Sequence, residues 1–272
     1  MEFALAGTAN GTQMTRASFG FTWYFRAMQN LGFTRSSVKL DHALLTPDSF
    51  IRAPLPGFVG ATCVVHIASA LGAQFTQYTV EAQPGGKFGP PPIETSRFVF
   101  VLEGEFVLTV GKKPRVLKRK GYAYIPPNLE HSITAKGVAK AMVIEKLYEH
   151  LGGDEPELIV GDSSKVVTGP VLGDPSVQVG VLIPDEPRYD MQVNTMTFDP
   201  GASLSLVEIH VMEHGLTMLE GGGMYRLGDN WYPVQSGDVI YMAPYCPQWF
   251  GALGKSRSQY LIYKDWNRHP LE

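Results

Sequence analysis

Hydrophobic and polar residues alternate in short runs along most of the chain. The runs in the first half include "TCVVHIA", "FTQYTVEA", "RFVFVLEGEFVLTVG" and "GYAYIPP", and those in the second half include "MQVNTMTFDPG", "GMYRLG", "GDVIYMAP" and "SQYLIYKD". They are rich in β-branched and aromatic residues and are bounded by turn residues, as strands of an antiparallel sheet are. The chain also holds 29 Gly and 20 Pro, which suit many turns. The pattern predicts an all-β sandwich or barrel architecture.

Helical periodicity is scarce by comparison. We expect a short helix near Glu186 to Tyr189, and "WYFRAMQNLGF" at residues 23–33 is a second candidate. The first thirty or so residues show no readable period, and residues 1–37 are interpreted as an N-terminal arm or leader.

An internal repeat defines the domain organisation. The two copies superpose at an offset of 117 residues, which lays "LEG" at 102–104 on "LEG" at 219–221, Gly111 on Gly228, and His131 on Gln248. Gly121 misses Gly237 by one residue. Each copy combines a Gly-bounded hairpin with a strand that runs from Gly to Pro. The repeat predicts two small barrels in tandem.

The predicted boundaries follow from the repeat. Residues 38–150 form the N-terminal barrel, residues 151–176 the linker, and residues 177–272 the C-terminal barrel. A chain of 272 residues with 44% hydrophobic composition is ample for cores of this size.

Charge and cysteine content exclude some functions. A net charge of −3 gives no reason to expect nucleic acid as a partner. The basic run "GKKPRVLKRK" at residues 111–120 is interrupted by apolar residues and Pro, so it is interpreted as an exposed hairpin. Cys63 and Cys246 are interpreted as two buried thiols. No apolar run approaches the roughly 18 residues of a membrane span, and no clear secretory signal is present, so we expect a soluble, cytoplasmic protein without membrane partners.

The segment "VEIHVMEHGLTMLEG" at residues 207–221 carries candidate chemistry. On a strand, Glu208, His210 and His214 would share one face, because side chains an even number of residues apart point the same way. Gln248 follows the strand "GDVIYMAP" and would close the site from the other side. Two imidazoles, a carboxylate and an amide oxygen suit Mn²⁺ or Fe²⁺. The alternative is that Glu208 and His214 are surface groups and His210 a hydrogen-bonded core residue.

The first copy of the repeat lacks this set. Subtracting 117 from the four positions gives Pro91, Ile93, Arg97 and His131, of which only His131 could bind a metal ion. One imidazole does not hold a divalent ion, and Arg97 would repel it. The N-terminal barrel is therefore predicted to be metal-free, with His131 a polar core or surface residue.

These motifs resemble those of the cupin superfamily. Cupins carry a ligand pair, a third ligand, a Gly-rich turn and a fourth ligand after a strand of the form G-D-x-x-x-x-P, which here read "PGASLSLVEIHVMEHGLTMLEGGG" and "GDVIYMAPYCPQW". The usual order is His-x-His, Glu and His. This chain keeps the positions but places Glu208 and His210 in the pair, His214 third and Gln248 fourth. The resemblance implies a tandem double-stranded β-helix, a bicupin with two jelly-roll barrels.

A closer resemblance is to the bicupin family of (S)-ureidoglycine aminohydrolases. It rests on "EIHVMEHG", on "APYCPQW" and on the tail "YLIYKDWNR", and covers roughly residues 38–269. It implies a Mn²⁺ enzyme that releases ammonia from a small ureide in purine catabolism, and a homo-oligomer. Glu208 and Gln248 would then handle protons at the reacting carbon as well as bind metal.

The last strand supplies candidates for binding the substrate. Tyr260 and Lys264 lie four residues apart in "QYLIYKD" and would share a face at the mouth of the site, where the family resemblance favours them as a clamp for the substrate carboxylate. Lys264 is also a candidate catalytic residue, and Tyr225 in "GMYRLG" is a further candidate contact. Without the resemblance, Lys264 would be interpreted as an exposed lysine and Tyr260 as a core ring.

Two other function classes stay open. The same two-histidine, one-carboxylate set can hold Fe²⁺, as in a cupin oxygenase or isomerase. A non-enzymatic storage or binding bicupin is the other alternative, although it would leave the four-ligand set without a purpose.

Overall fold

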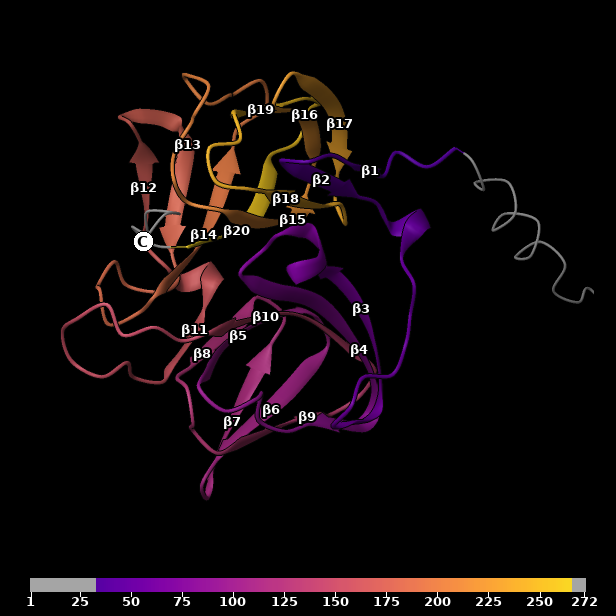
Figure 1. The fold of residues 1–272 in the computed structure, drawn as a ribbon, viewed down its shortest axis with the longest axis vertical. Coiled ribbons are helices and arrows are strands. Elements are labelled where there is room, and N and C mark those ends of the chain that lie inside the picture. Colours follow the sequence, from indigo (N-terminus) through magenta and orange to yellow (C-terminus); the bar gives the residue numbers. More distant parts are fainter. Residues whose placement is uncertain (1–32, 266–272) are drawn as a thin grey trace, which may run out of the picture. The chain divides into compact units, whose positions relative to one another are not determined.

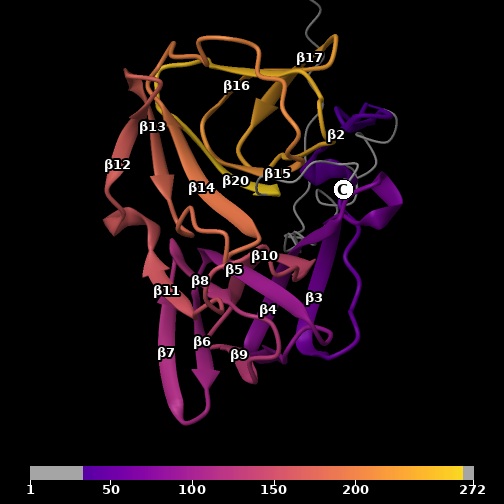
Figure 2. The same ribbon diagram turned by 60° about the vertical axis from the view of Figure 1, so that its left-hand side comes forward.

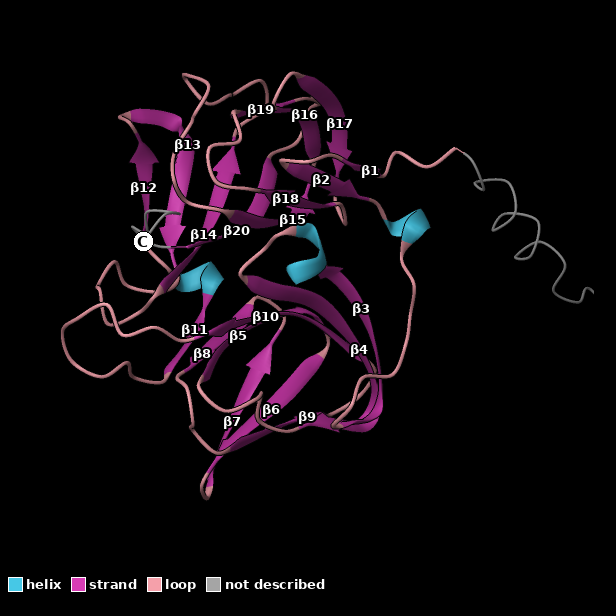
Figure 3. Ribbon diagram, in the orientation of Figure 1, coloured by secondary structure: helices cyan, strands magenta, loops and turns pink. Residues whose placement is uncertain are grey.

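A computed structural model describes residues 33–265, and the main compact unit starts at Arg35. Strands dominate it, all paired antiparallel (Figures 1 and 3). The helical segments in the described residues are three single 3₁₀ turns, Pro47–Ser49, Ser69–Leu71 and Ser163–Lys165. The all-β prediction is therefore confirmed.

The first sheet is built mostly from the N-terminal half. Its path is β11 (Ile159–Asp162), β8 (Gly121–Ile125), β5 (Thr95–Glu103), β10 (Ala139–Leu147), β4 (Phe75–Phe88), β9 (His131–Ala135), β6 (Glu105–Val110) and β7 (Lys113–Lys118), with β3 (Phe58–Ile67) also paired to β4. The long β4 pairs β10 along its first part and β9 at its end, so the sheet curls towards a closed barrel.

The second half forms two sheets. The larger runs β1 (Ser37–Val38), β2 (His42–Leu45), β18 (Val239–Met242), β15 (His214–Glu220), β20 (Ser258–Asp265), β14 (Met191–Phe198), β13 (Asp174–Val181) and β12 (Thr168–Val171). The smaller runs β17 (Asn230–Gln235), β16 (Gly222–Leu227) and β19 (Gln248–Ala252). The division into two separate barrels remains a prediction.

The strands repeat at the offset found in the sequence. Adding 117 to the bounds of β6, β7 and β9 gives the bounds of β16, β17 and β19. The turns repeat too, since Gly111 and Gly228 both have φ of 57°, and Asn128 and Tyr245 have φ of 60° and 62°. Equal spacing of strands and equal turn conformations show that the two halves share the same succession of strands and turns.

Strand pairing crosses the predicted domain boundaries. Adding 117 to β2 gives β11, so these two strands are counterparts. However, β2 pairs with β18 of the C-terminal half, and β11 pairs with β8 of the N-terminal half. The strand β2 therefore extends the C-terminal sheet and its counterpart β11 extends the N-terminal sheet, and Figure 2 shows β2 among the C-terminal strands and β11 beside β8. The segment predicted as a linker, 151–176, contains β11 and β12.

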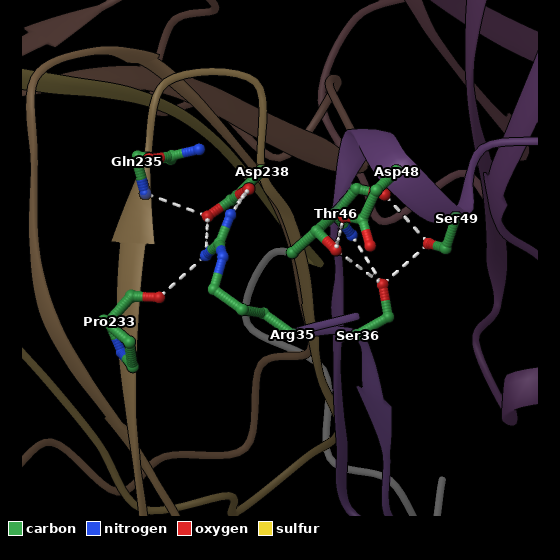
Figure 4. Close-up of polar contacts among 8 residues, drawn as sticks. All are labelled: Arg35, Ser36, Thr46, Asp48, Ser49, Pro233, Gln235 and Asp238. Carbon is green, nitrogen blue, oxygen red and sulfur yellow. Dashed lines mark hydrogen bonds and ion pairs between the residues drawn. The ribbon is translucent and has the colours of Figure 1, made fainter. Parts of the chain in front are cut away.

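Polar contacts hold β2, and the residues that precede it, against the C-terminal half. Arg35 forms a two-pronged ion pair with Asp238, with N–O distances of 2.7 and 2.8 Å, and also donates to the Pro233 carbonyl (Figure 4). Ser36 lies 2.8 Å from the Thr46 hydroxyl, which ties the two ends of the β1–β2 hairpin. Such a bidentate guanidinium contact fixes orientation as well as position.

Three hydrophobic clusters fill the fold. One lies in the N-terminal half and includes Val99 and Phe106, and a second lies in the C-terminal half and includes Phe198 and Phe250. The third joins residues from both halves, among them Phe98 and Tyr263. Neighbours on one strand, such as Phe98 and Val99, face different clusters because side chains alternate across a sheet.

The remaining sequence predictions concern two short helices, the two cysteines and the basic run, and their outcomes differ. The helix near Glu186 to Tyr189 is wrong: Tyr189 N donates to Glu186 O in a single turn, because Pro187 disfavours helical geometry at the residue before it. The candidate helix at 23–33 lies, but for Phe33, outside the described residues. Both cysteines are buried free thiols, as predicted. The basic run contributes the turn and strand β7 of the β6–β7 hairpin.

The described part of the chain contains no helix with the length and hydrophobicity that crossing a membrane requires.

Candidate metal and active site

The segment that precedes β15 is irregular, which corrects the expectation of a continuous strand. Residues 207–213 hold one isolated bridge, in which Glu208 and Gln248 exchange both backbone hydrogen bonds at 2.8 and 2.9 Å. The His210 carbonyl instead accepts from Tyr245 N at 2.8 Å, in the loop before Gln248. His214 is the first residue of β15. The backbone is therefore shaped by the β18–β19 loop rather than by a strand ladder.

Three of the four predicted metal ligands nevertheless converge. His210 Nε2 lies 3.3 Å from His214 Nε2, and the Gln248 side-chain amide lies 2.9 Å from His210 Nε2. The two rings are nearly perpendicular, with centroids 4.8 Å apart. Gln248 and His214 are both buried. Residues from β15, β19 and the irregular segment thus direct their polar tips to one point.

Both imidazoles favour the neutral form. Burial, followed by the charge of His210, lowers the pKa of His214 to about 3. Burial and the charge of Lys264 lower the pKa of His210. His214 Nδ1 donates to the Tyr263 carbonyl at 3.0 Å, so its Nε2 carries the lone pair that faces His210. Neutral imidazoles with one nitrogen held by a hydrogen bond are suited to metal binding.

Glu208 stands further from this point than the three converging residues. Among the described residues, Glu208, His210 and His214 do not form a group whose ligand atoms all lie within 4.8 Å of one another. Burial raises the pKa of Glu208, while the charge of Lys264 opposes that rise. Its carboxylate also acts on the buried Tyr225 and Tyr260 hydroxyls. Glu208 therefore interacts electrostatically with Lys264 and Tyr260 of β20 but does not form a compact ligand group with the two histidines.

The predicted lysine lies in the same row of the sheet as His214. In register, Lys264 on β20 stands between His214 on β15 and Gln192 on β14, and paired residues of antiparallel strands point to one face. Burial lowers the pKa of Lys264, and the charges of Asp185 and Glu208 oppose this shift. A half-buried ammonium is thus directed to the face of the sheet that bears His214.

The two candidate tyrosines are more buried than expected. Tyr260 is 2% exposed and Tyr225 is 1% exposed, and both pack in the C-terminal core. Burial, followed by the charge of Tyr225, raises the pKa of Tyr260. The two hydroxyls are hydrogen-bond partners. The strand pattern suggested that Tyr260 lies at the mouth of the site, but its ring is buried within the core.

The donor set fits a metal ion. Two neutral imidazoles and an amide meet at a buried point, and the amide can present its oxygen after half a turn about its last bond. No thiolate takes part, and N/O sets of this kind suit Mn²⁺ or Fe²⁺. Glu208 would supply the carboxylate after a change of side-chain rotamer.

In the N-terminal half, the guanidinium group of Arg97 occupies the place equivalent to the metal ligands. Arg97 is 2% exposed, and its Nη1 lies 3.0 Å from His131 Nε2. Its Nε and Nη2 donate to Glu145, at 2.8 and 2.6 Å. The guanidinium makes the contacts that stabilise His131 and Glu145 inside this half. This arrangement agrees with the expectation that the first half carries no metal, which remains a prediction.

Sequence reasoning missed two residues of the site. Gln192 is 4% exposed and pairs with Lys264, and the alternation in "MQVNTMTF" could have placed it on the polar face. Asp185 influences Lys264 from the loop after β13, and no sequence signal marks it. A loop residue of that kind is found only when the fold brings it to its partner.

Comparison with known proteins identifies relatives. The family model described as "Cupin domain" matches residues 78–145. The chain is 46% identical over 243 residues to a protein of Arabidopsis thaliana named (S)-ureidoglycine aminohydrolase, covering 88% of this chain and 80% of that protein. It is 34% identical over 235 residues to the (S)-ureidoglycine aminohydrolase of Escherichia coli strain K12, covering 84% and 89%.

Solved structures agree in fold. The crystal structure of the E. coli protein Ylba superposes with a TM-score of 0.78 at 29% identity, covering 88% of this chain and 97% of that one. An oxalate decarboxylase superposes with a TM-score of 0.63 at 12% identity, covering 96% and 87%, which shows likeness of fold alone.

Proposed function

Because this chain belongs to the (S)-ureidoglycine aminohydrolase family of cupin proteins, we propose that it hydrolyses (S)-ureidoglycine to (S)-ureidoglycolate and ammonia. In this reaction the bond between the central carbon and the amine breaks, and a bond from the same carbon to a water oxygen forms. The amine leaves as ammonia after gaining a proton. The reaction would follow the breakdown of allantoate in ureide catabolism.

One observation carries the proposal: His210, His214 and Gln248 converge on a buried point, and Lys264 shares the sheet face of His214. A small substrate with a carboxylate and an amine needs a cation for the first and a fixed polar face for the second. The site offers both on one side of the sheet.

Each candidate residue would have a separate role in the proposed reaction. Lys264 donates to the substrate carboxylate and so orients the central carbon towards the histidines. Glu208 would accept and orient protons at the reacting carbon as water arrives and the amine departs. Gln248 can hydrogen-bond the substrate while binding a metal only weakly, which a histidine at this position would not do. Tyr225 and Tyr260, which are buried in the core and hydrogen-bonded to each other, interact electrostatically with the Glu208 carboxylate.

A divalent ion fits this proposal. His210, His214 and Gln248, with Glu208, would hold Mn²⁺, or alternatively Fe²⁺, and the ion would supply Lewis-acid polarisation of the bound substrate. Its identity is a proposal that rests on the nitrogen and oxygen donors of the site.

The test is stereochemical. (S)-ureidoglycine is generated in place from allantoate by an allantoate amidohydrolase, this protein is added with Mn²⁺, and ammonia release and the chirality of ureidoglycolate are followed. We expect faster release and a single enantiomer, both lost in His214→Ala and kept in the exposed control His150→Ala. Racemic product at the uncatalysed rate, with metal bound, would refute the proposed reaction. Oxygen consumption with a ureide would indicate an oxygenase instead.

A second experiment addresses Gln248. Gln248→His should retain metal but lower the rate and stereospecificity, since the imidazole would bind the ion strongly in place of contacting substrate. Full rate and a single enantiomer in Gln248→His would show that the amide has no such role.

A further inference from the structure

A second group of potential metal ligands lies in the C-terminal half, apart from the histidine site. It consists of Asp41, His42 and Cys246, and its carboxylate, imidazole and thiol donor atoms all lie within 4.8 Å of one another. Among the His, Cys, Asp and Glu residues between positions 33 and 265, no other trio meets this spacing. His42 and Cys246 are 1% and 3% exposed.

The exchanged strand brings these residues together. His42 on β2 pairs with Met242 at the end of β18, and the Asp41 carbonyl accepts from Ala243 N at 2.9 Å. The chain then turns back, with Cys246 N donating to Ala243 O at 3.1 Å, which returns the thiol to Asp41. The cluster therefore forms only where β2 of one half enters the sheet of the other.

Both ring nitrogens of His42 have polar partners. Its Nδ1 lies 2.8 Å from Asp41 Oδ1, and its Nε2 lies 3.0 Å from the Tyr232 hydroxyl. In the tautomer whose Nε2 donates to Tyr232, the lone pair of Nδ1 faces the carboxylate oxygen. A metal ion bound by both atoms would lie between them, with Tyr232 holding the ring.

Space beside the cluster is also provided. At Gly228, which has φ of 57°, a Cβ would lie 3.2 Å from Asp41 Oδ2 and 3.9 Å from His42 Nδ1, so the missing side chain leaves room beside the cluster. The Gly228 amide donates to the Pro247 carbonyl at 2.8 Å, which fixes this turn next to the residue that follows Cys246.

The other half provides an internal comparison. Because β2 corresponds to β11, the counterparts of Asp41 and His42 lie 117 residues later, at Leu158 and Ile159, and the counterpart of Cys246 lies 117 residues earlier, at Leu129. These three apolar residues are partly buried and pack in the hydrophobic clusters. The strand exchange thus packs well with apolar residues, and the three polar donors are not required by the fold.

We propose that Asp41, His42 and Cys246 form a second metal site, which binds a borderline-soft divalent cation of the Zn²⁺ class through one sulfur, one nitrogen and one oxygen. Asp41 is 46% exposed in its side chain, so water can complete a four-coordinate shell from that side. Thiolate favours zinc over the Mn²⁺ expected at the histidines. This proposal does not rest on the proposed reaction.

The second ion would stiffen the loop that bears Gln248. The loop runs from the end of β18 to Gln248, and Tyr245 in it donates to the His210 carbonyl. His42 and His214 also flank Met242 in one row of the sheet, two strand spacings or roughly 10 Å apart. Binding at the cluster would therefore hold Gln248 and His210 in place.

Cobalt distinguishes the two sites. The full-length protein is loaded with Co²⁺, and the near-ultraviolet thiolate-to-cobalt charge-transfer absorption is recorded, since the site at the histidines has no thiolate. We expect the band in the wild type and in the control Cys63→Ser, its loss in Cys246→Ser, and its weakening in Asp41→Ala. X-ray absorption of the zinc form should show a sulfur at about 2.3 Å.

Two spectroscopic outcomes would overturn the proposal. A wild-type protein that binds Co²⁺ without the band, or a band that survives in Cys246→Ser, would exclude the site. The triple variant Asp41→Leu, His42→Ile, Cys246→Leu carries the residues of the other half and should fold without the band and with one bound ion fewer per chain. Equal metal content in this variant and the wild type would also refute the proposal.

Discussion

Lys264 is the residue whose role depends most on the substrate. Its half-buried ammonium faces Glu208 and lies in register with His214. Lys264→Met keeps the length of the side chain but removes the charge, so we expect kcat/KM to fall about 10- to 100-fold, mainly through KM, as for a lost charged hydrogen bond. Steady-state ammonia release checks this.

The control for Lys264 is Lys118→Met, which changes a lysine that is 75% exposed in its side chain and should leave kinetics unaltered. An unchanged KM in Lys264→Met would mean that another cation holds the carboxylate.

His66 makes stability depend on pH. Burial, with the charge of Lys140, lowers its pKa from 6.5 to about 4, and its Nε2 lies 2.8 Å from the Thr79 hydroxyl. Between pH 6.5 and 4, His66 binds a proton in the unfolded chain but not in the folded protein. The free energy of unfolding therefore decreases as pH falls through this window, by about 3 kcal/mol at the lower end. His66→Gln should remove this part of the pH dependence.

Urea unfolding at several pH values between 4 and 7.5 measures the effect of His66→Gln. The other histidines are the same in both proteins, so the difference between the two pH profiles isolates His66. The exposed control His150→Gln should follow the wild type. Parallel profiles for wild type and His66→Gln would assign the pH dependence elsewhere.

At the scale of an element, β15 requires a glycine next to His214. A Cβ at Gly215 would meet the side-chain oxygen of Gln77 and lie 2.6 Å from Phe75 Cε2, across the contact between the halves. Gly215→Ala should therefore destabilise the protein by about 1–3 kcal/mol through overpacking, and weaken metal binding by shifting His214. Denaturant unfolding and metal affinity are the measurements.

A matched control exists for Gly215. Gly169 lies in β12, and a methyl group added there would meet nothing within 4 Å, so Gly169→Ala should change stability by less than about 0.5 kcal/mol. Equal effects of the two substitutions would show that β15 can shift to accommodate the methyl group.

Strand exchange is the other feature at this scale. β2 and β11 occupy equivalent places in opposite halves, and neither half completes its sheet from its own segment. A sheet edge without its partner strand leaves backbone groups unpaired, so each half depends on the other for a covered edge.

Across the whole molecule, a buried lysine joins the halves. Lys146 on β10 lies 2.7 Å from Asp190 and 3.6 Å from Asp265, and the side chains of Lys146 and Asp190 are 1% and 0% exposed. Lys146→Met would leave two carboxylates without this ammonium, which costs about 3–5 kcal/mol for a buried pair. Denaturant unfolding checks this value.

The exposed pair Arg257 and Asp199 provides the comparison. Its side chains are 69% and 43% exposed, so Arg257→Met should cost about 0–1 kcal/mol. If Lys146→Met costs no more than this, the ion pair does not hold the halves together.

Much of the fold followed from local pattern. Alternating side chains and Gly-bounded turns depend on neighbours in the chain, which is why the offset of 117 residues located strands such as β6 and β16. The even spacing of His210 and His214 and the resemblance to the cupin ligand pattern predicted that these residues would meet Gln248, and the three side chains do lie together.

The remaining features required the tertiary structure. The burial of Tyr260, the irregular path of residues 207–213 and the exchange of β2 and β11 depend on which distant strands pair. The cluster of Asp41 and Cys246 has the same origin. Sequence by itself determined which residues alternate, turn and repeat, since these are short-range properties, whereas only packing between segments decided which strand lies beside which and hence which donors meet.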